Sequence, residues 1–402
     1  MSLRFFSALL LFGFLLSCSS DEESQVLDFS QEQPTVPVHE QIAPVPTPTT
    51  APAPTTAPAP TAVPTPTPEP DCLSEIPTRT LLGQLIMTLA YPEDFETVRE
   101  LSINHEIGIM GILGAPTAQE LADLHQATSS SLLPLLIASD EEGGRVQRLR
   151  GELGGIPSAA ELSLVPLKDI EQIFLEYGQG LSNLGIKIAL APVVDVGQGP
   201  GIGDRSFSND PQSVIRNAEA VIAGYEQAGI LPVLKHFPGH GNASQDSHVG
   251  LATTPNLEVL RQVDLLPYQA LLKDDLMVMM GHLWVPDLTE NLPASLSSAA
   301  VEGLLRGELG FDGLVITDSL GMGAISERWS ILEAAVLAIN AGVNVVMVSS
   351  PQQVSSLIDG MQTSLVAGEL DSEKVFNSIE RVLSLKAADS CQLVESLQNK
   401  TN

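Results

Sequence analysis

The segment ILPVLKH at residues 230–236, followed by FPGHGNASQDSH at residues 237–248, contains the pattern that decides the fold. Its first part is almost continuously apolar, which is typical of a strand buried on both faces of a parallel sheet. The run ends in Lys235 and His236, two polar side chains that would be costly inside a closed core. A loop follows, since the PGHG centre disfavours helix and lets the backbone turn sharply. An apolar strand, polar residues at its end and a long loop therefore form one unit.

Eight apolar runs of this kind recur, and amphipathic segments typical of helices lie between them. In one such segment, Asp210 can cap the first turn, Pro211 suits the first helical position, and Gly229 follows the end. This alternation predicts an α/β fold, and eight units predict a (β/α)8 barrel of the TIM type over residues 72–391. The predicted strands are 82–89, 107–113, 132–139, 186–194, 230–236, 276–281, 313–318 and 343–349. The predicted helices include 211–228, 257–273, 298–309, 331–341 and 372–388.

Polar side chains end or follow five of the predicted strands. In a barrel these positions meet at one rim, where active sites are built. A doubly wound sheet is the alternative, but it would gather its polar residues at a single crevice. The residues are Asp140 and Glu141 after the third strand, Asp195 after the fourth, Lys235 and His236 at the end of the fifth, His282 after the sixth and Asp318 at the end of the seventh.

Two of the polar segments suit acid/base and nucleophilic chemistry. Asp246 stands two residues before His248, so in an extended stretch both side chains lie on one side. A carboxylate beside an imidazole fixes its tautomer and favours its protonated form, which suits proton donation to a leaving oxygen. Asp318 is well placed as a nucleophile, although an aspartate there could equally cap a helix. Residues 140–149, DEEGGRVQRL, add carboxylate and guanidinium groups that suit sugar hydroxyls.

A metal site is a further interpretation of the three histidines and one aspartate within residues 236–248. Their spacing matches neither His-Glu-x-x-His nor a Cys/His finger, so no metal is predicted. For His240 a structural role in the loop is favoured over a catalytic one. No cofactor and no protein partner is predicted either.

The first 71 residues predict export and a spacer. Residues 1–18 have the features of a signal peptide, because an apolar run at 5–16 ends at LLSC, which resembles a bacterial lipobox. Cys18 would then carry lipid and anchor the protein to a membrane outside the cytoplasm; an ordinary cleaved signal is the alternative. Residues 19–71 predict a disordered linker, because the stretch 44–70 is dominated by Pro, Thr and Ala and leaves almost nothing apolar to bury.

The cysteines predict a disulfide, and the net charge bears on the possible partners. If Cys18 is lipidated, Cys72 and Cys391 remain at the two edges of the folded region, and export favours a disulfide between them over two free thiols. Residues 392–402 are predicted to be a C-terminal tail. Asp and Glu outnumber Lys and Arg 49 to 19, which argues against a nucleic-acid partner.

Taken together, the segments resemble glycoside hydrolase family 3, and specifically its β-N-acetylhexosaminidase branch, whose bacterial members act on peptidoglycan fragments. The most specific match is KHFPGHG at 235–241 followed by DSH at 246–248. Further matches are APVVD at 191–195, DRSF at 204–207, MGH at 280–282, PASLS at 293–297 and Asp318.

The resemblance implies a (β/α)8 barrel and a two-step retaining mechanism on terminal β-linked N-acetylglucosamine. Asp318 matches the family's nucleophile, and His248, with Asp246 as its partner, matches the acid/base. Asp195 matches a supporting residue rather than a direct contact. The positions that match sugar-binding contacts are Asp140, Arg148, Arg205, Lys235 and His236.

The chain departs from the family pattern at Asn242, where an acidic residue is common, and at residues 114–116, GAP, which replace a polar Arg-Asn pair. It leaves no room for the second domain from which family glucosidases take their acid/base, which favours the hexosaminidase branch. Two alternatives remain: a phosphorylase that uses phosphate in place of water, and a non-catalytic lipoprotein that binds cell-wall glycans.

Overall fold

The computed structural model describes residues 72–129 and 131–400. The predictions for residues 1–71, namely the signal peptide, the lipid on Cys18 and the linker, lie outside the described residues. Within the described part of the chain, no helix is both long enough and apolar enough to cross a membrane.

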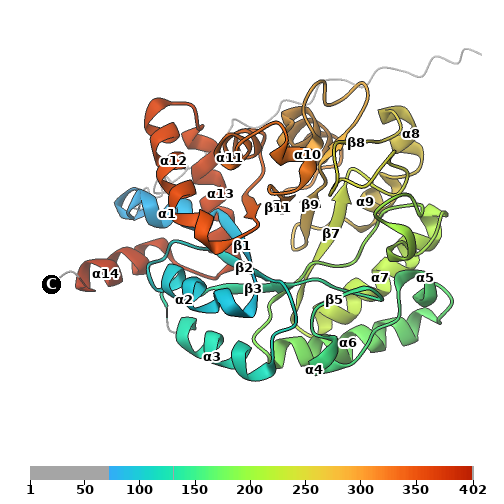
Figure 1. The fold of residues 1–402 in the computed structure, drawn as a ribbon, viewed down its shortest axis with the longest axis horizontal. Coiled ribbons are helices and arrows are strands. Elements are labelled where there is room, and N and C mark those ends of the chain that lie inside the picture. The colour runs from blue at the N-terminus through green and yellow to red at the C-terminus, as the bar shows by residue number, and fades with distance from the viewer. Residues whose placement is uncertain (1–71, 130, 401–402) are drawn as a thin grey trace, which may run out of the picture. The chain divides into compact units, whose positions relative to one another are not determined.

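Eight parallel strands in this part of the chain close into a barrel, in the order β1-β12-β11-β9-β7-β6-β3-β2 (Figure 1). Closure is direct, because the first strand pairs with both the second and the last. The predicted (β/α)8 barrel is therefore confirmed, and the doubly wound sheet is excluded. The strands are β1 (Ile86–Ala90), β2 (Ile109–Ile112), β3 (Leu136–Ser139), β6 (Ile188–Ala189), β7 (Leu231–Phe237), β9 (Met277–Met280), β11 (Leu314–Ser319) and β12 (Val345–Val348).

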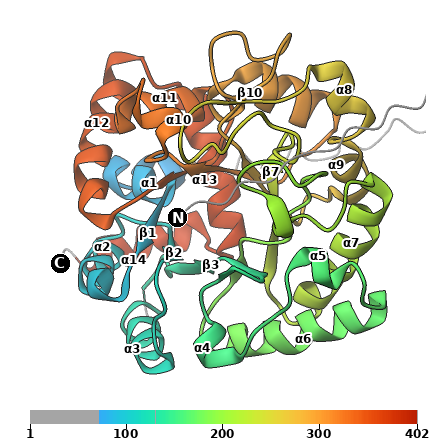
Figure 2. The same cartoon turned by 45° about the vertical axis from the view of Figure 1, so that its right-hand side comes forward.

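Helices surround the barrel in both views (Figures 1 and 2). Strands such as β9 and β12 are buried along their whole length, between the barrel interior and this outer layer, which explains their continuous apolar sequence. The α-helices are α1 (Thr78–Gln84), α2 (Phe95–Ile103), α3 (Ala118–Thr128), α4 (Arg150–Leu153), α5 (Ala159–Leu162), α6 (Leu167–Asn183), α7 (Pro211–Gln227), α8 (Leu257–Gln262), α9 (Leu266–Leu271), α10 (Gly323–Ser326), α11 (Ile331–Asn340), α12 (Val354–Ala367), α13 (Ser372–Leu385) and α14 (Ser390–Lys400). A π-helix, η5, spans Ala299–Glu308, and short 3-10 helices are η1 (Cys72–Glu75), η2 (Pro92–Asp94), η3 (Gly203–Arg205), η4 (Ala294–Leu296) and η6 (Pro351–Gln353).

Two small sheets shape the loops that follow the barrel strands. An antiparallel hairpin of β4 (Glu141–Gly143) and β5 (Val146–Gln147) comes directly after β3. A parallel pair of β8 (Ala252–Thr253) and β10 (Leu283–Trp284) ties the long loop after β7 to the loop after β9.

Several predicted elements differ from those in the structure; the strand predicted at 186–194, for example, is only the two-residue β6. Residues 82–84 of the first predicted strand belong to α1, because the buried face of the helix and the strand form one apolar run that periodicity does not divide. The helix predicted at 257–273 is two helices, α8 and α9, the second with a proline in its first turn. The predicted tail is helical as far as Lys400 and forms most of α14, because Leu393 and Val394 are buried against the core.

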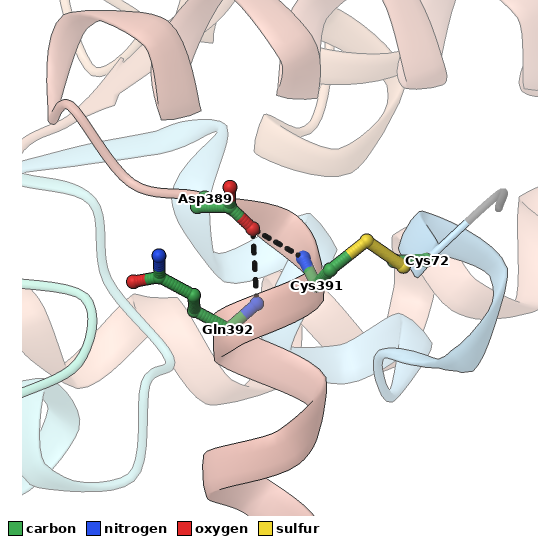
Figure 3. The surroundings of a disulfide bond; sticks show 4 residues. All are labelled: Cys72, Asp389, Cys391 and Gln392. Atoms are coloured by element: carbon green, nitrogen blue, oxygen red, sulfur yellow. Dashed lines mark hydrogen bonds between the residues drawn. A yellow bond between two sulfur atoms is a disulfide. The ribbon is translucent and has the colours of Figure 1, made fainter. Parts of the chain in front are cut away.

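A disulfide joins Cys72 in η1 to Cys391 in the first turn of α14 (Figure 3). Their Cα atoms are 5.0 Å apart. The carboxylate of Asp389 accepts hydrogen bonds from the backbone N–H groups of Cys391 and Gln392, both at 2.9 Å, and so caps the start of the helix. The disulfide thus links the first and last helices of the described chain through two cysteines that are 319 residues apart in sequence.

Candidate active site

A cavity of about 670 Å³ opens at the carboxyl ends of the barrel strands. Each of the eight strands contributes a lining residue close to its carboxyl end, as expected for the catalytic face of a barrel. The sequence-predicted catalytic and sugar-binding residues all lie on this cavity: Asp140, Arg148, Arg205, Lys235, His236, Asp246, His248 and Asp318.

The amine of Lys235 lies between two carboxylates. It donates to Asp140 Oδ1 at 2.8 Å and lies 2.6 Å from Glu142 Oε1. Arg148 Nη2 donates to the other oxygen of Asp140 at 2.9 Å. Burial would raise the pKa of Asp140, but the charges of Lys235 and Arg148 outweigh it and hold the pKa well below its usual range. The pKa of Lys235 is raised, because the two carboxylates outweigh its burial.

Arg205 forms the second buried ion pair. Its Nε and Nη2 donate to the two carboxylate oxygens of Glu142, at 2.8 and 2.9 Å. This two-point geometry fixes the guanidinium plane, and Glu142 is only 3% exposed. Burial alone would raise the pKa of Glu142, but Lys235 and Arg205 lower it. Asp140, Glu142, Lys235 and Arg205 therefore form a charged, rigid cluster, which we call the ionic cluster.

The imidazole of His236 is held by Asp195, which is fully buried. His236 Nδ1 lies 2.7 Å from Asp195 Oδ2, and the backbone N–H groups of His236 and His240 donate to Oδ1 at 3.3 and 2.6 Å. Burial would raise the pKa of Asp195, but His236 and the other donors hold it low. The ionised carboxylate accepts a hydrogen bond from Nδ1. The other ring nitrogen of His236, Nε2, lies 3.3 Å from Arg205 Nη2. Asp195 thus acts through His236 and does not line the cavity.

Asp318 stands near the end of β11 with its carboxylate on the cavity. One of its oxygens accepts from the backbone N–H of Ser319 at 2.8 Å. Burial would raise the pKa of Asp318, but the nearby imidazoles of His236 and His282 and the Ser319 N–H lower it. An ionised carboxylate on a concave surface is chemically suited to nucleophilic attack.

His248 is carried by the loop between β7 and β8, which we call the histidine loop (residues 238–251). Asp246 Oδ1 accepts from the backbone N–H of His248 at 2.9 Å and lies 2.8 Å from its Nδ1. Partial burial would raise the pKa of Asp246, but these contacts lower it. The imidazole is 63% exposed, and Asp246 occupies its Nδ1 side, so Nε2 is open for proton transfer.

The comparisons with known proteins agree with this geometry. The model of the glycosyl hydrolase family 3 N-terminal domain matches residues 79–385. The chain belongs to glycosyl hydrolase family 3. A β-hexosaminidase of Mycobacterium tuberculosis, LpqI, is 46% identical over 266 residues, which cover 63% of this chain and 68% of that protein.

Solved structures of family 3 members have the same fold. The crystal structure of a family 3 glycosyl hydrolase from Mycobacterium smegmatis has a TM-score of 0.73 at 40% identity and covers 78% of this chain and 98% of its own. A β-N-acetylhexosaminidase from Beutenbergia cavernae has a TM-score of 0.70 at 27% identity, with coverage of 78% and 99%. The resemblance predicted from the motifs is therefore confirmed.

In this family 3 barrel, Glu142 is a residue that sequence reasoning missed. Residues 141–143 form β4, so neighbouring carboxylates point to opposite sides. Glu142 turns to Lys235 and Arg205, whereas Glu141 turns to Ser139 and to the Tyr177 hydroxyl at 2.7 Å. The alternation of side chains along a strand would have separated Glu141 from Glu142, but nothing in the sequence marks the short run DEEGG as a strand.

His282 and His240 support the site from behind. His282 contacts the Ser319 carbonyl at 2.9 Å and the Ser295 hydroxyl at 2.7 Å, and burial lowers its pKa. His240 Nε2 lies 3.0 Å from the Ser247 hydroxyl, so it ties the base of the histidine loop to its tip. Among residues 72–129 and 131–400, no three His, Cys, Asp or Glu side chains are grouped so that they could hold a metal ion.

Proposed function

We propose that the protein is a retaining β-N-acetylhexosaminidase that removes terminal β-linked N-acetylglucosamine. The observation that carries the proposal is that an ionised carboxylate, Asp318, and an exposed imidazole with a carboxylate partner, His248 with Asp246, line the same cavity. The names of the relatives support the choice of sugar, since the matching proteins of Mycobacterium tuberculosis and Xylella fastidiosa are both named β-hexosaminidases.

The reaction has two steps. In the first, a carboxylate oxygen of Asp318 attacks the anomeric carbon, while the bond from that carbon to the leaving oxygen breaks. His248 Nε2 donates its proton to this oxygen, and a glycosyl-aspartate ester remains. In the second step, water gives a proton to His248 Nε2 and attacks the same carbon, and the Asp318 carboxylate is released. Two inversions retain the β configuration.

The ionic cluster and His236 hold the sugar. Asp140 is ionised and able to accept hydrogen bonds from sugar hydroxyls, while Lys235, Arg148 and Arg205 supply donors. Because these groups are already paired with one another, they are oriented before the substrate enters, which lowers the entropy cost of binding.

The natural substrate class that we propose is peptidoglycan fragments or chitin oligosaccharides outside the cytoplasm. The sequence of residues 1–18, with Cys18 as the lipidated position, and the Pro-rich residues 19–71 support an anchor and a spacer that present the barrel to such glycans.

The first test is hydrolysis of p-nitrophenyl β-N-acetylglucosaminide beside the β-glucoside and the β-xyloside, with and without phosphate. We expect the N-acetyl substrate to be preferred, with free N-acetylglucosamine first released as the β-anomer. Sugar 1-phosphate as the main product would identify a phosphorylase. The α-anomer as first product would disprove the retaining mechanism. Folded protein that binds these glycans without turning any of them over would identify the non-catalytic lipoprotein.

A further inference from the structure

Two glycines lie against the histidine loop, and neither position has room for a side chain. A Cβ atom at Gly201, which is in the segment between β6 and α7, would lie 2.9 Å from Asp246 Cγ. A Cβ atom at Gly323, the first residue of α10, would lie 2.9 Å from the Val249 carbonyl oxygen and 3.0 Å from that of His248. Real Cβ atoms essentially never approach other atoms more closely than 3.0 Å, so a substitution must displace one partner.

The Gly201 side of this contact is firmly held. Its carbonyl accepts from Arg205 Nη1 at 3.1 Å and from Arg145 Nη2 at 3.3 Å. Arg205 is itself fixed by Glu142 in the ionic cluster, and Arg145 also donates to the Ile202 carbonyl at 2.7 Å. Because several charge-assisted bonds hold this segment, a collision at Gly201 would be relieved by movement of Asp246.

Movement of Asp246 would also move the imidazole. The carboxylate holds His248 at two points, through the backbone N–H and through Nδ1, so it sets both the loop conformation and the ring orientation. On the other side, the backbone N–H groups of Gly323 and Ala324 donate to the carbonyls of His248 and Ser247, at 3.3 and 3.4 Å. The tip of the histidine loop is therefore held from two sides, by segments that follow β6 and β11.

We propose that Gly201 and Gly323 are positioning residues that together clamp the histidine loop and set the direction of His248 Nε2 toward the leaving oxygen. They act by the absence of a side chain, which lets Asp246 and the loop backbone approach. The inference rests on the proposed acid/base role of His248.

A misdirected acid affects substrates according to their leaving group. Chitobiose needs a proton on its departing oxygen. In 2,4-dinitrophenyl β-N-acetylglucosaminide, the dinitrophenyl substrate, the leaving group is acidic and departs without one. For a two-step enzyme, kcat/KM reports steps up to formation of the glycosyl-enzyme, so it isolates this proton transfer. A general loss of folding or binding would lower both values equally.

The experiment compares full-length Gly201→Ala, Gly323→Ala and His248→Ala with two matched controls. Gly154→Ala shares the positive φ of Gly201 (87° against 84°), and Gly151→Ala has an ordinary φ, like Gly323. At either control position a Cβ would meet no atom of a described non-neighbouring residue within 4 Å. We expect both clamp variants to lose about tenfold or more in kcat/KM for chitobiose and less than about threefold for the dinitrophenyl substrate. The controls should change neither value.

The outcomes separate the two proposals. If His248→Ala shows the leaving-group dependence and both clamp variants behave like their controls, the clamp is disproved while the acid/base role stands. If His248→Ala loses equally on both substrates, the acid/base role fails and the clamp fails with it. Melting temperatures of all variants show which are folded. If one clamp variant fails to fold, the other still tests the clamp, because the two glycines belong to different segments. A folded clamp variant that behaves like its control disproves the role of that glycine.

Discussion

The ionic cluster and the tip of the histidine loop belong to the same active site but are held in very different ways. Lys235 and Glu142 are 2% and 3% exposed, and each contacts more than one group of opposite charge. His248 is 63% exposed, Asp246 is 35% exposed, and the two have only each other as an ionic partner within the described chain. The site thus combines a buried part, in which Lys235 and Glu142 each have two ionic partners, with an exposed part that has a single ion pair.

This difference matches the two tasks of a glycosidase. Sugar binding benefits from groups that are fixed and shielded from water, because their charges act strongly in a low-dielectric site. Proton transfer in a two-step reaction needs the leaving group to depart and water to enter past the same residue. An exposed pair is cheap to displace, since surface ion pairs contribute little to stability. Binding is therefore expected to depend on the buried part and turnover on the exposed part.

The largest effect is expected at Asp318, which lines the same cavity as both parts. Asp318→Ala removes the proposed nucleophile, so kcat/KM for p-nitrophenyl β-N-acetylglucosaminide should fall by more than about a thousandfold while the melting temperature stays close to that of the wild type. Asp318→Glu should be almost as inactive, because the carboxylate is moved along the attack direction. Asp123→Ala, on the exposed face of α3, is the control and should be fully active. Substantial turnover by Asp318→Ala would contradict the assignment.

The next largest effect concerns the stability of the ionic cluster. Lys235→Met leaves Asp140 and Glu142 short of one shared cation inside the barrel, which should lower the free energy of unfolding by about 4 kcal/mol. Urea unfolding measures this. The comparison is Lys374→Met, which breaks a half-exposed pair with Glu302 and should cost less than about 1 kcal/mol. Equal losses of unfolding free energy in the two variants would mean that the buried ion pairs of the ionic cluster matter no more for stability than an exposed pair does.

A third prediction tests where the buried part ends, beneath the histidine loop. Asp264 is buried, near the charge of Asp195, with a 3.4 Å contact from Asn242 of the loop, and its burial raises its pKa to about 7. Between pH 3.8, its ordinary pKa, and pH 7, the unfolded chain releases this proton while the folded protein keeps it. The stability contribution of protonated Asp264 is therefore complete below pH 3.8 and lost as the pH rises to about 7.

Asp264→Asn should remove this dependence. Across that pH window, the free energy of unfolding of the wild type should fall by about 3 kcal/mol relative to the variant. Urea unfolding at several pH values gives the difference, in which other titrating groups cancel. A constant difference would show that Asp264 is ionised throughout and that water reaches the base of the loop.

The sequence was sufficient for the barrel and for the grouping of the site residues, for a physical reason. Continuous apolar runs identify strands buried on both faces, and charged residues at their ends have no place but the rim, so Asp140, Lys235 and Asp318 were assigned to one end of the barrel. The family motifs then gave Asp246 and His248 their roles. Both kinds of signal, apolar runs and short motifs, lie within a few consecutive residues and can therefore be recognised without knowing the tertiary structure.

What escaped prediction depends on contacts between distant segments. The choice between Glu141 and Glu142 is set by the β4 hairpin, which brings one of them to Arg205, 63 residues away. The contact between Gly201 and Asp246 joins two loops that no periodicity connects. The helix α14 extends into the predicted C-terminal tail, because Leu393 and Val394 are buried against the core.

The smallest expected effect on stability, and the sharpest test of the contrast, is at the exposed pair. Asp246→Asn removes the carboxylate charge that orients His248, the proposed acid/base, so kcat/KM for chitobiose should fall about tenfold, with little change for the dinitrophenyl substrate. The free energy of unfolding should change by less than about 1 kcal/mol, because the pair is screened by water. Asp312→Asn, which weakens another exposed pair far along the chain, is the control and should leave both kinetic values intact. A loss of stability as large as that of Lys235→Met would mean that the tip of the histidine loop is part of the same rigid unit as the ionic cluster, and the division of labour between the two would no longer hold.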